Sequence, residues 1–184
     1  MKSSLLIAIL SAACAAQTET LSVVPVHLDA TVSIPKAIQF FCTKDYDRQD
    51  CLKDSIALRH ALAPYPLNRL GAWSFVLAPS YGWKNLVHSL GGNPKSPAFS
   101  IIEQHTTVLE RSLFSATPSR SKDLLLAFGV IGSSLLDLAV THELGHGICQ
   151  EMDERRADDH RRELRQTKTV DCTKTSERKT QASR

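Results

Sequence analysis

Residues 134–146 read Ser-Leu-Leu-Asp-Leu-Ala-Val-Thr-His-Glu-Leu-Gly-His, and this stretch decides the fold that we expect. Ser134 and Asp137 have the S-x-x-[DE] spacing that is typical of a helix start. The apolar residues that follow are Leu135, Leu136, Leu138, Ala139 and Val140. We therefore expect a core helix over residues 135–147, with the two histidines near its end.

His142 and His146 are one helical turn apart, so both imidazoles lie on one face, about 6 Å from each other. Zinc accepts such nitrogen ligands and keeps one position for water in catalytic sites. Glu143 lies beside the first histidine, where its carboxylate can act on that water as a general base. A surface helix could carry the same pattern by chance, but here the pattern continues a core helix. We expect a zinc centre with Glu143 as its catalytic residue.

A third protein ligand must follow a turn of the chain. A helix that continued eight residues past His146 would rise about 12 Å, beyond the reach of a side chain back to the ion. Residues 147–150 are the natural place for the turn. In the metzincin pattern a Gly and then a His follow the second histidine, at the positions of Cys149 and Met152 here, so that pattern fails.

Two glutamates follow the expected turn, Glu151 and Glu154, and both are candidate ligands. Glu154 is favoured because it lies on the inward stripe of the next expected helix, and because Asp158 follows it four residues later. Asp158 can accept a hydrogen bond from His142 and so fix the tautomer of that ring.

The pattern His-Glu-x-x-His, followed by Glu-x-x-Ala-Asp on the next helix, resembles the gluzincin metallopeptidases. The short interval between the two parts resembles the compact, single-domain minigluzincins. The resemblance covers about residues 134–166. It implies an α+β fold: a compact zincin-like domain with a small mixed sheet, an active-site helix and a following helix that carries the third metal ligand.

The resemblance also implies an activity, the zinc-dependent hydrolysis of peptide bonds through a zinc-bound water that Glu143 activates. The implied partner is a peptide or protein substrate. By position, the Zn²⁺ ligands would be His142, His146 and Glu154, with Glu143 as the general base and Asp158 supporting His142.

Two other functions stay open at this point. One is a catalytically inactive, zinc-stabilised binding module. The small size of the chain favours it, because there is no second domain to form the other side of a deep cleft. The intact Glu143 favours an enzyme, since structural zinc alone needs no carboxylate there. The other is a helical protein without zinc, in which the motif arose by chance.

The chain divides into four expected parts. They are a signal peptide over 1–16, an N-terminal extension or edge strand over 17–36, the zincin-like domain over 37–166, and a polar tail over 167–184 that we expect to be disordered. Within the domain we expect helices over 51–63, 83–90, 124–128 (capped at Ser121) and 153–166, a strand over 73–77, and one strand or a hairpin over 98–114.

Two further histidines carry weaker signals. His105 can lie on a substrate-side strand, since zincins commonly bind peptide at a sheet edge, but the preferred interpretation is a solvent-facing side chain. His160 stands among charged residues and is interpreted as part of a charged face. The sequence assigns no transition-state donor.

The N-terminus predicts export. Lys2 precedes an apolar stretch and a small-residue A-x-A site at Ala13-Cys14-Ala15, the layout of a secretory signal peptide. A lipoprotein signal would instead anchor the chain through Cys14, but Ser11 stands where that signal usually carries Leu. We therefore expect a periplasmic or secreted protein.

Removal of that segment would leave an even number of cysteines: Cys42, Cys51, Cys149 and Cys172. An exported chain in an oxidising compartment favours disulfides, and three pairings are possible. A structural zinc site would need a C-x-x-C pair that the sequence lacks.

The charge distribution bears on partners. The formal net charge is +3, and residues 155–184 contain ten Lys or Arg but only five Asp or Glu. A basic excess confined to one end differs from the basic face of nucleic-acid binders, so we expect no nucleic-acid partner. The apolar stretch 124–140 contains Asp137 and two glycines, so we expect no transmembrane span in the mature chain.

Overall fold

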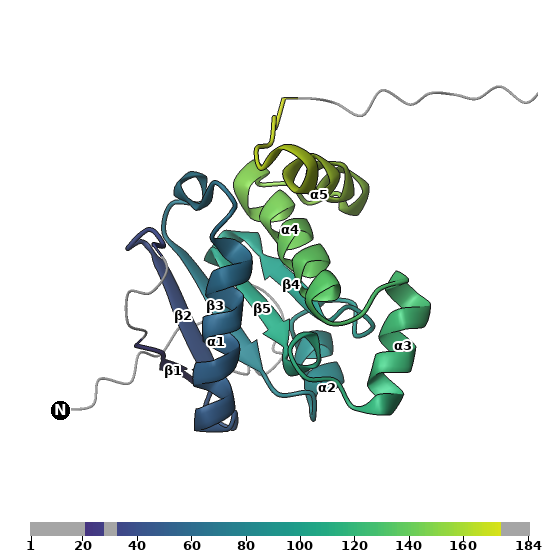
Figure 1. The fold of residues 1–184 in the computed structure, drawn as a ribbon. Coiled ribbons are helices and arrows are strands. Elements are labelled where there is room, and N and C mark those ends of the chain that lie inside the picture. Colours follow the sequence, from purple (N-terminus) through teal and green to yellow (C-terminus); the bar gives the residue numbers. More distant parts are fainter. Residues whose placement is uncertain (1–20, 28–32, 174–184) are drawn as a thin grey trace, which may run out of the picture.

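The computed structural model describes residues 21–27 and 33–173. The expected signal peptide, Cys14 included, lies outside the described residues. The fold is α+β, as expected, and is built on one small mixed sheet (Figure 1). The strands are β1 (Val23–Pro25), β2 (Ile38–Thr43), β3 (Trp73–Ala78), β4 (Ala98–Ile101) and β5 (Thr106–Glu110). The helices are α1 (Arg48–Leu62), α2 (Trp83–Ser89), α3 (Pro118–Phe128), α4 (Ser133–Cys149) and α5 (Glu154–Thr167).

The strand order is β1-β2-β3-β5-β4. The three inner strands are parallel, and both edge strands, β1 and β4, run antiparallel to their neighbours. β4 and β5 form the hairpin that was one of the two expectations for residues 98–114. β4 ends the sheet, so its outer edge has no strand partner in the described chain.

Helices cover both faces of this sheet. Alternate side chains of β3 point to opposite faces: Trp73, Phe75 and Leu77 belong to the large core cluster with α1 and α4, whereas Val76 and Ala78 pack with α2. α4 crosses the sheet close to β4, and α5 lies against the end of α4 (Figure 1). The sheet therefore supports α4, and α4 in turn positions α5.

Three expected helix starts are wrong. α1 begins at Arg48, where Asp47 caps it by accepting from two backbone N–H groups. α3 begins at Pro118 with Thr117 as its cap, because proline at the first helical position fits a helix start better than the expected cap at Ser121. α4 begins at Ser133, and its cap is Gly132, whose positive φ of 61° turns the chain in from α3.

The C-terminal boundary also needs correction. Residues 168–173 continue the fold beyond α5, because Val170 is buried in the core and Cys172 forms a disulfide with Cys149. The expected disordered tail is wrong for this part; residues 174–184 lie outside the described chain. A second disulfide joins Cys42 to Cys51, so all four cysteines are paired as disulfides within the described chain.

Among the described residues no single helix is both long and apolar enough to cross a membrane. α3 and α4 meet that test only when taken together, as a pair bent by 54°.

Candidate metal centre

The end of α4 and the start of α5 form the site. α4 ends at Cys149. The next residue, Gln150, has a left-handed backbone (φ 51°) that reverses the chain, and the N–H of Glu151 bonds to the carbonyl of His146. α5 starts at Glu154, with Asp153 as a cap that accepts from the N–H groups of Arg155 and Arg156. This turn places the first residue of α5 opposite the motif on α4. The turn begins later than expected: of residues 147–150 only Gln150 lies in it, because α4 continues to Cys149.

α4 and α5 pack unusually closely at Gly145. A methyl group at Gly145 would lie 2.9 Å from the carbonyl oxygen of Ala157 and 3.1 Å from Cβ of His160. Such contacts are shorter than van der Waals separation, so only glycine allows this approach. Gly145, the glycine within the motif, thus allows α5 to come within ligand distance of the histidines.

His142, His146 and Glu154 converge on one point. Nε2 of His142 lies 3.1 Å from Nε2 of His146 and 3.0 Å from Oε2 of Glu154, and Nε2 of His146 lies 3.6 Å from that oxygen. Tetrahedral zinc with bonds of about 2.0–2.1 Å separates neighbouring ligand atoms by about 3.3–3.4 Å. The observed separations fall on both sides of that value, so the three residues fit zinc.

The outer nitrogens of both rings are held by acceptors. Nδ1 of His142 lies 2.9 Å from Oδ1 of Asp158, and Nδ1 of His146 lies 2.6 Å from the backbone carbonyl oxygen of Glu151. A carbonyl or carboxylate oxygen can only accept, so each Nδ1 donates to its acceptor, and Nε2 is the nitrogen of each ring that is left to bind a metal ion. These two nitrogens and the carboxylate of Glu154 face one another, an arrangement that a bound cation would satisfy.

Glu143 lies beside this cluster without belonging to it. Its side chain is buried (4% exposed) and accepts a hydrogen bond from the Ser100 hydroxyl at 2.7 Å. Burial raises the pKa of Glu143 above its ordinary value, while the neighbouring His142 and His146 and the Ser100 hydrogen bond act in the opposite direction. Glu143 is therefore a shielded carboxylate next to three candidate ligands.

Glu151, the rival ligand, is engaged elsewhere. Its carboxylate forms an ion pair with Arg156 at 2.7 Å and accepts from the N–H of Asp153 at 2.9 Å. Its backbone carbonyl, rather than its side chain, serves the site by holding His146. The preference for Glu154 over Glu151 matches the cluster that the structure brings together.

A cleft of about 920 Å³ opens over the cluster, near the upper end of the range for ligand pockets. It is lined by β4 and by residues of α3, α4 and α5. Apolar side chains contribute much of the lining, among them Phe99, Ile101, Phe128, Leu135, Leu138 and Met152. A basic side chain, Arg161, lies at the rim, where its guanidinium is 3.4 Å from Oδ1 of Asp158.

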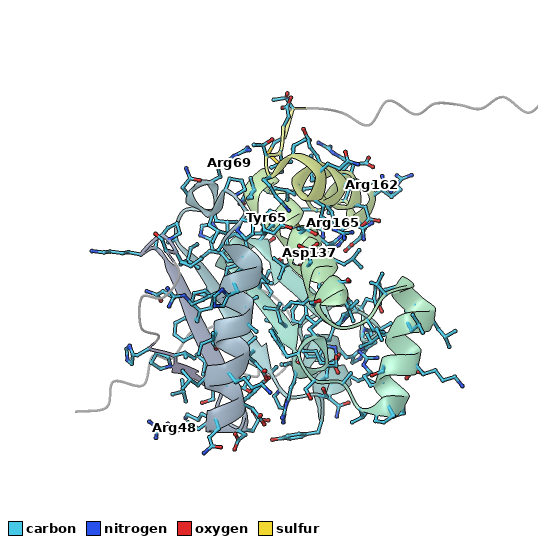
Figure 2. All side chains as sticks on the ribbon, viewed as in Figure 1. Arg48, Tyr65, Arg69, Asp137, Arg162 and Arg165 are labelled. Atoms are coloured by element: carbon cyan, nitrogen blue, oxygen red, sulfur yellow. A yellow bond between two sulfur atoms is a disulfide. The ribbon has the colours of Figure 1, made fainter. Side chains whose placement is uncertain are left out.

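A second polar cluster lies on the other side of α4. Tyr65 donates to Asp137, and Arg165 of α5 donates to the other carboxylate oxygen of Asp137 at 2.8 Å (Figure 2). These contacts join the segment that follows α1 to the first half of α4 and to α5, so the cluster holds together the helices that carry the candidate ligands.

Sequence reasoning located the motif residues but missed others. Ser100 and the carbonyl of Glu151 carry no local signal, because each depends on pairing or chain reversal rather than on residue spacing. His105 is exposed and stacks on Trp73 at 5.5 Å between ring centroids, as the solvent-facing interpretation expected. His160 is buried and not part of a charged face, because α5 turns it toward α4 beside Gly145.

No protein-family model matches this chain, and neither a curated protein nor a solved structure matches it at a significant level.

Proposed function

We propose that this chain is a zinc-dependent metallopeptidase of the gluzincin type. The observation that supports this proposal best is the convergence of three acceptor atoms, Nε2 of His142, Nε2 of His146 and Oε2 of Glu154, beside a buried carboxylate that is not one of them. A site that only stabilises the fold has no use for that fourth group. A hydrolase needs it as a base.

The chain's own residues divide the work. His142, His146 and Glu154 would hold Zn²⁺, which when bound supplies a Lewis acid that polarises the scissile carbonyl and lowers the pKa of water. Glu143 takes a proton from the attacking water and passes it to the leaving amine. Asp158 and the carbonyl of Glu151 keep both imidazoles in the tautomer that presents Nε2 to the ion.

The cleft supports a peptide as the substrate. β4 has no strand partner on its outer edge in the described chain, and its residues line the cleft. An extended peptide can add to such an edge through main-chain hydrogen bonds, with side chains directed alternately into the cleft and away from it. The apolar lining favours bulky apolar side chains next to the scissile bond.

The two disulfides support the proposal that the protein is exported. Disulfides persist in oxidising compartments such as the periplasm or the extracellular space, and both pairs are closed here.

The decisive test compares wild type with Glu143→Gln. Both proteins are purified without chelator, their zinc content is measured, and both are incubated with a quenched fluorescent peptide library. We expect both to bind zinc, wild type to cleave peptides, and Glu143→Gln to lose at least about 100-fold of the rate. Equal cleavage by both zinc-loaded proteins would contradict the role of Glu143 as the general base. Zinc without cleavage in wild type would favour the inactive binding module.

A further inference from the structure

A line of hydrogen bonds runs across the sheet and ends on Glu143. The indole Nε1–H of Trp73 on β3 donates to Oγ1 of Thr107 on β5 at 3.0 Å. Oγ1 of Thr107 lies 2.9 Å from Oγ of Ser100 on β4, and Ser100 donates to Oε2 of Glu143 at 2.7 Å. The four side chains thus connect three neighbouring strands with α4.

The direction of this line follows from its two ends. An indole N–H only donates, and an ionised carboxylate only accepts. Each hydroxyl carries one hydrogen and can donate one hydrogen bond. Ser100 donates to Glu143, so it must accept from Thr107. Thr107 therefore donates to Ser100 and accepts from Trp73. Every hydrogen in the line therefore points toward Glu143.

Three of the four residues in this line, Trp73, Thr107 and Ser100, lie on strands of the sheet, so the line does not depend on flexible segments. Ser100 and Thr107 are direct cross-strand partners in the β4–β5 pairing. Trp73 and Thr107 are both buried, at 2% and 1% exposure, and Trp73 belongs to the core cluster that α4 covers. Short polar side chains held in this way keep their rotamers, because buried groups that lose a partner are costly.

We propose that Ser100 is a positioning residue for Glu143: it holds Oε2 against β4 and leaves Oε1 as the oxygen that takes and returns the proton. This inference rests on the proposed function. It also links substrate to base, because β4 is the strand on which the peptide would lie, and the same strand then sets the orientation of the carboxylate.

The kinetic test uses the full mature chain loaded with zinc and one peptide selected from the library. Ser100→Ala should lower kcat about 10–100-fold, as removal of such supporting partners typically does, while KM and zinc content stay unchanged. Ser100→Thr keeps the hydroxyl and should restore kcat. Thr107→Val and Thr107→Ser form a second pair, in case Ser100→Ala does not fold. Thr106→Val is the matched control, since Thr106 is buried on the same strand but bonds to the carbonyl of Gln104.

A second readout does not depend on activity. The chain has two tryptophans, so ¹⁵N–¹H spectra of the same proteins should contain two indole N–H signals that can be followed separately. Trp73 reports the line, whereas Trp83 donates to the carbonyl of Ser96 at 2.9 Å and serves as an internal control. Ser100→Ala should shift the Trp73 signal and leave the Trp83 signal in place.

The outcomes separate this inference from the proposed function. An active wild type, together with a zinc-loaded Ser100→Ala that keeps kcat and the Trp73 signal, would overturn the role of Ser100 and leave the peptidase standing. A folded, zinc-loaded wild type that cleaves no peptide would overturn both. Loss of kcat in Ser100→Ala with recovery in Ser100→Thr, and a shifted Trp73 signal, would support the role.

Discussion

His142 on α4 and Asp158 on α5 are joined by a hydrogen bond of 2.9 Å between Nδ1 and Oδ1, and the opposite nitrogen of the same ring lies 3.0 Å from Glu154. Glu154 and Asp158 are one helical turn apart on α5, so their carboxylates contact the two nitrogens of the same imidazole. The carboxylate of Asp158 fixes the tautomer, and the carboxylate of Glu154 completes the cluster.

Asp158→Asn should weaken zinc binding about 10–100-fold, because a neutral amide stabilises the ring less and no longer sets its tautomer. Titration against a competing chelator measures this. The matched control is Asp159→Asn, whose carboxylate pairs with Arg162 away from the site and whose affinity should equal that of wild type. Equal affinity in Asp158→Asn and wild type would contradict the role of Asp158.

Gly145→Ala should reduce both stability and zinc affinity. The added methyl group would meet the carbonyl of Ala157 at 2.9 Å, and relief requires α5 to move away from α4. Overpacking of this kind costs about 1–3 kcal/mol in the free energy of unfolding, measured by urea denaturation of the metal-free protein.

The informative contrast is Gly147→Ala. Its methyl group would meet Leu70 and Trp73 on the sheet side, so it should cost stability without displacing α5. If Gly145→Ala bound zinc as tightly as wild type, the close approach of the two helices would not be what sets the ligand distance.

Much of the site could be predicted from the sequence, because it depends on spacing within helices. His142, His146 and Glu143 follow from one periodic stretch, and Glu154 with Asp158 follow from the next. The chain reversal between the two helices was also predictable, since a continuous helix would carry any third ligand out of reach.

Other parts depend on long-range pairing and carry no local signal. Ser100 meets Glu143 only because the β4–β5 register sets Ser100 opposite Thr107. β2 went unpredicted because helices cover both faces of the sheet, so its apolar run shows no alternation. The disulfide partners likewise depended on tertiary structure, since four cysteines allow three pairings.

Glu143→Gln should stabilise the metal-free protein at neutral pH. Burial raises the pKa of Glu143 in the folded state above the ordinary value of a glutamate, which applies in the unfolded chain. Between these two pKa values the folded state holds the extra proton, so the free energy of unfolding falls as pH rises through that window. The glutamine side chain does not titrate, so the variant does not lose stability in this way as pH rises.

Urea denaturation of chelator-treated wild type and Glu143→Gln at pH 4 and pH 7 checks this prediction. The variant should gain stability relative to wild type at pH 7 and lose most of that gain at pH 4. A gain that is the same at both pH values would show that the carboxylate is not destabilised by burial.

Metal content tests the central claim most directly. Wild type, Glu154→Ala and Glu151→Ala are purified without chelator and their bound zinc is quantified. We predict one zinc per chain in wild type and in Glu151→Ala, whose backbone carbonyl still holds His146, and a loss of zinc in Glu154→Ala. A folded wild type without zinc, or Glu154→Ala with its zinc intact, would contradict the account.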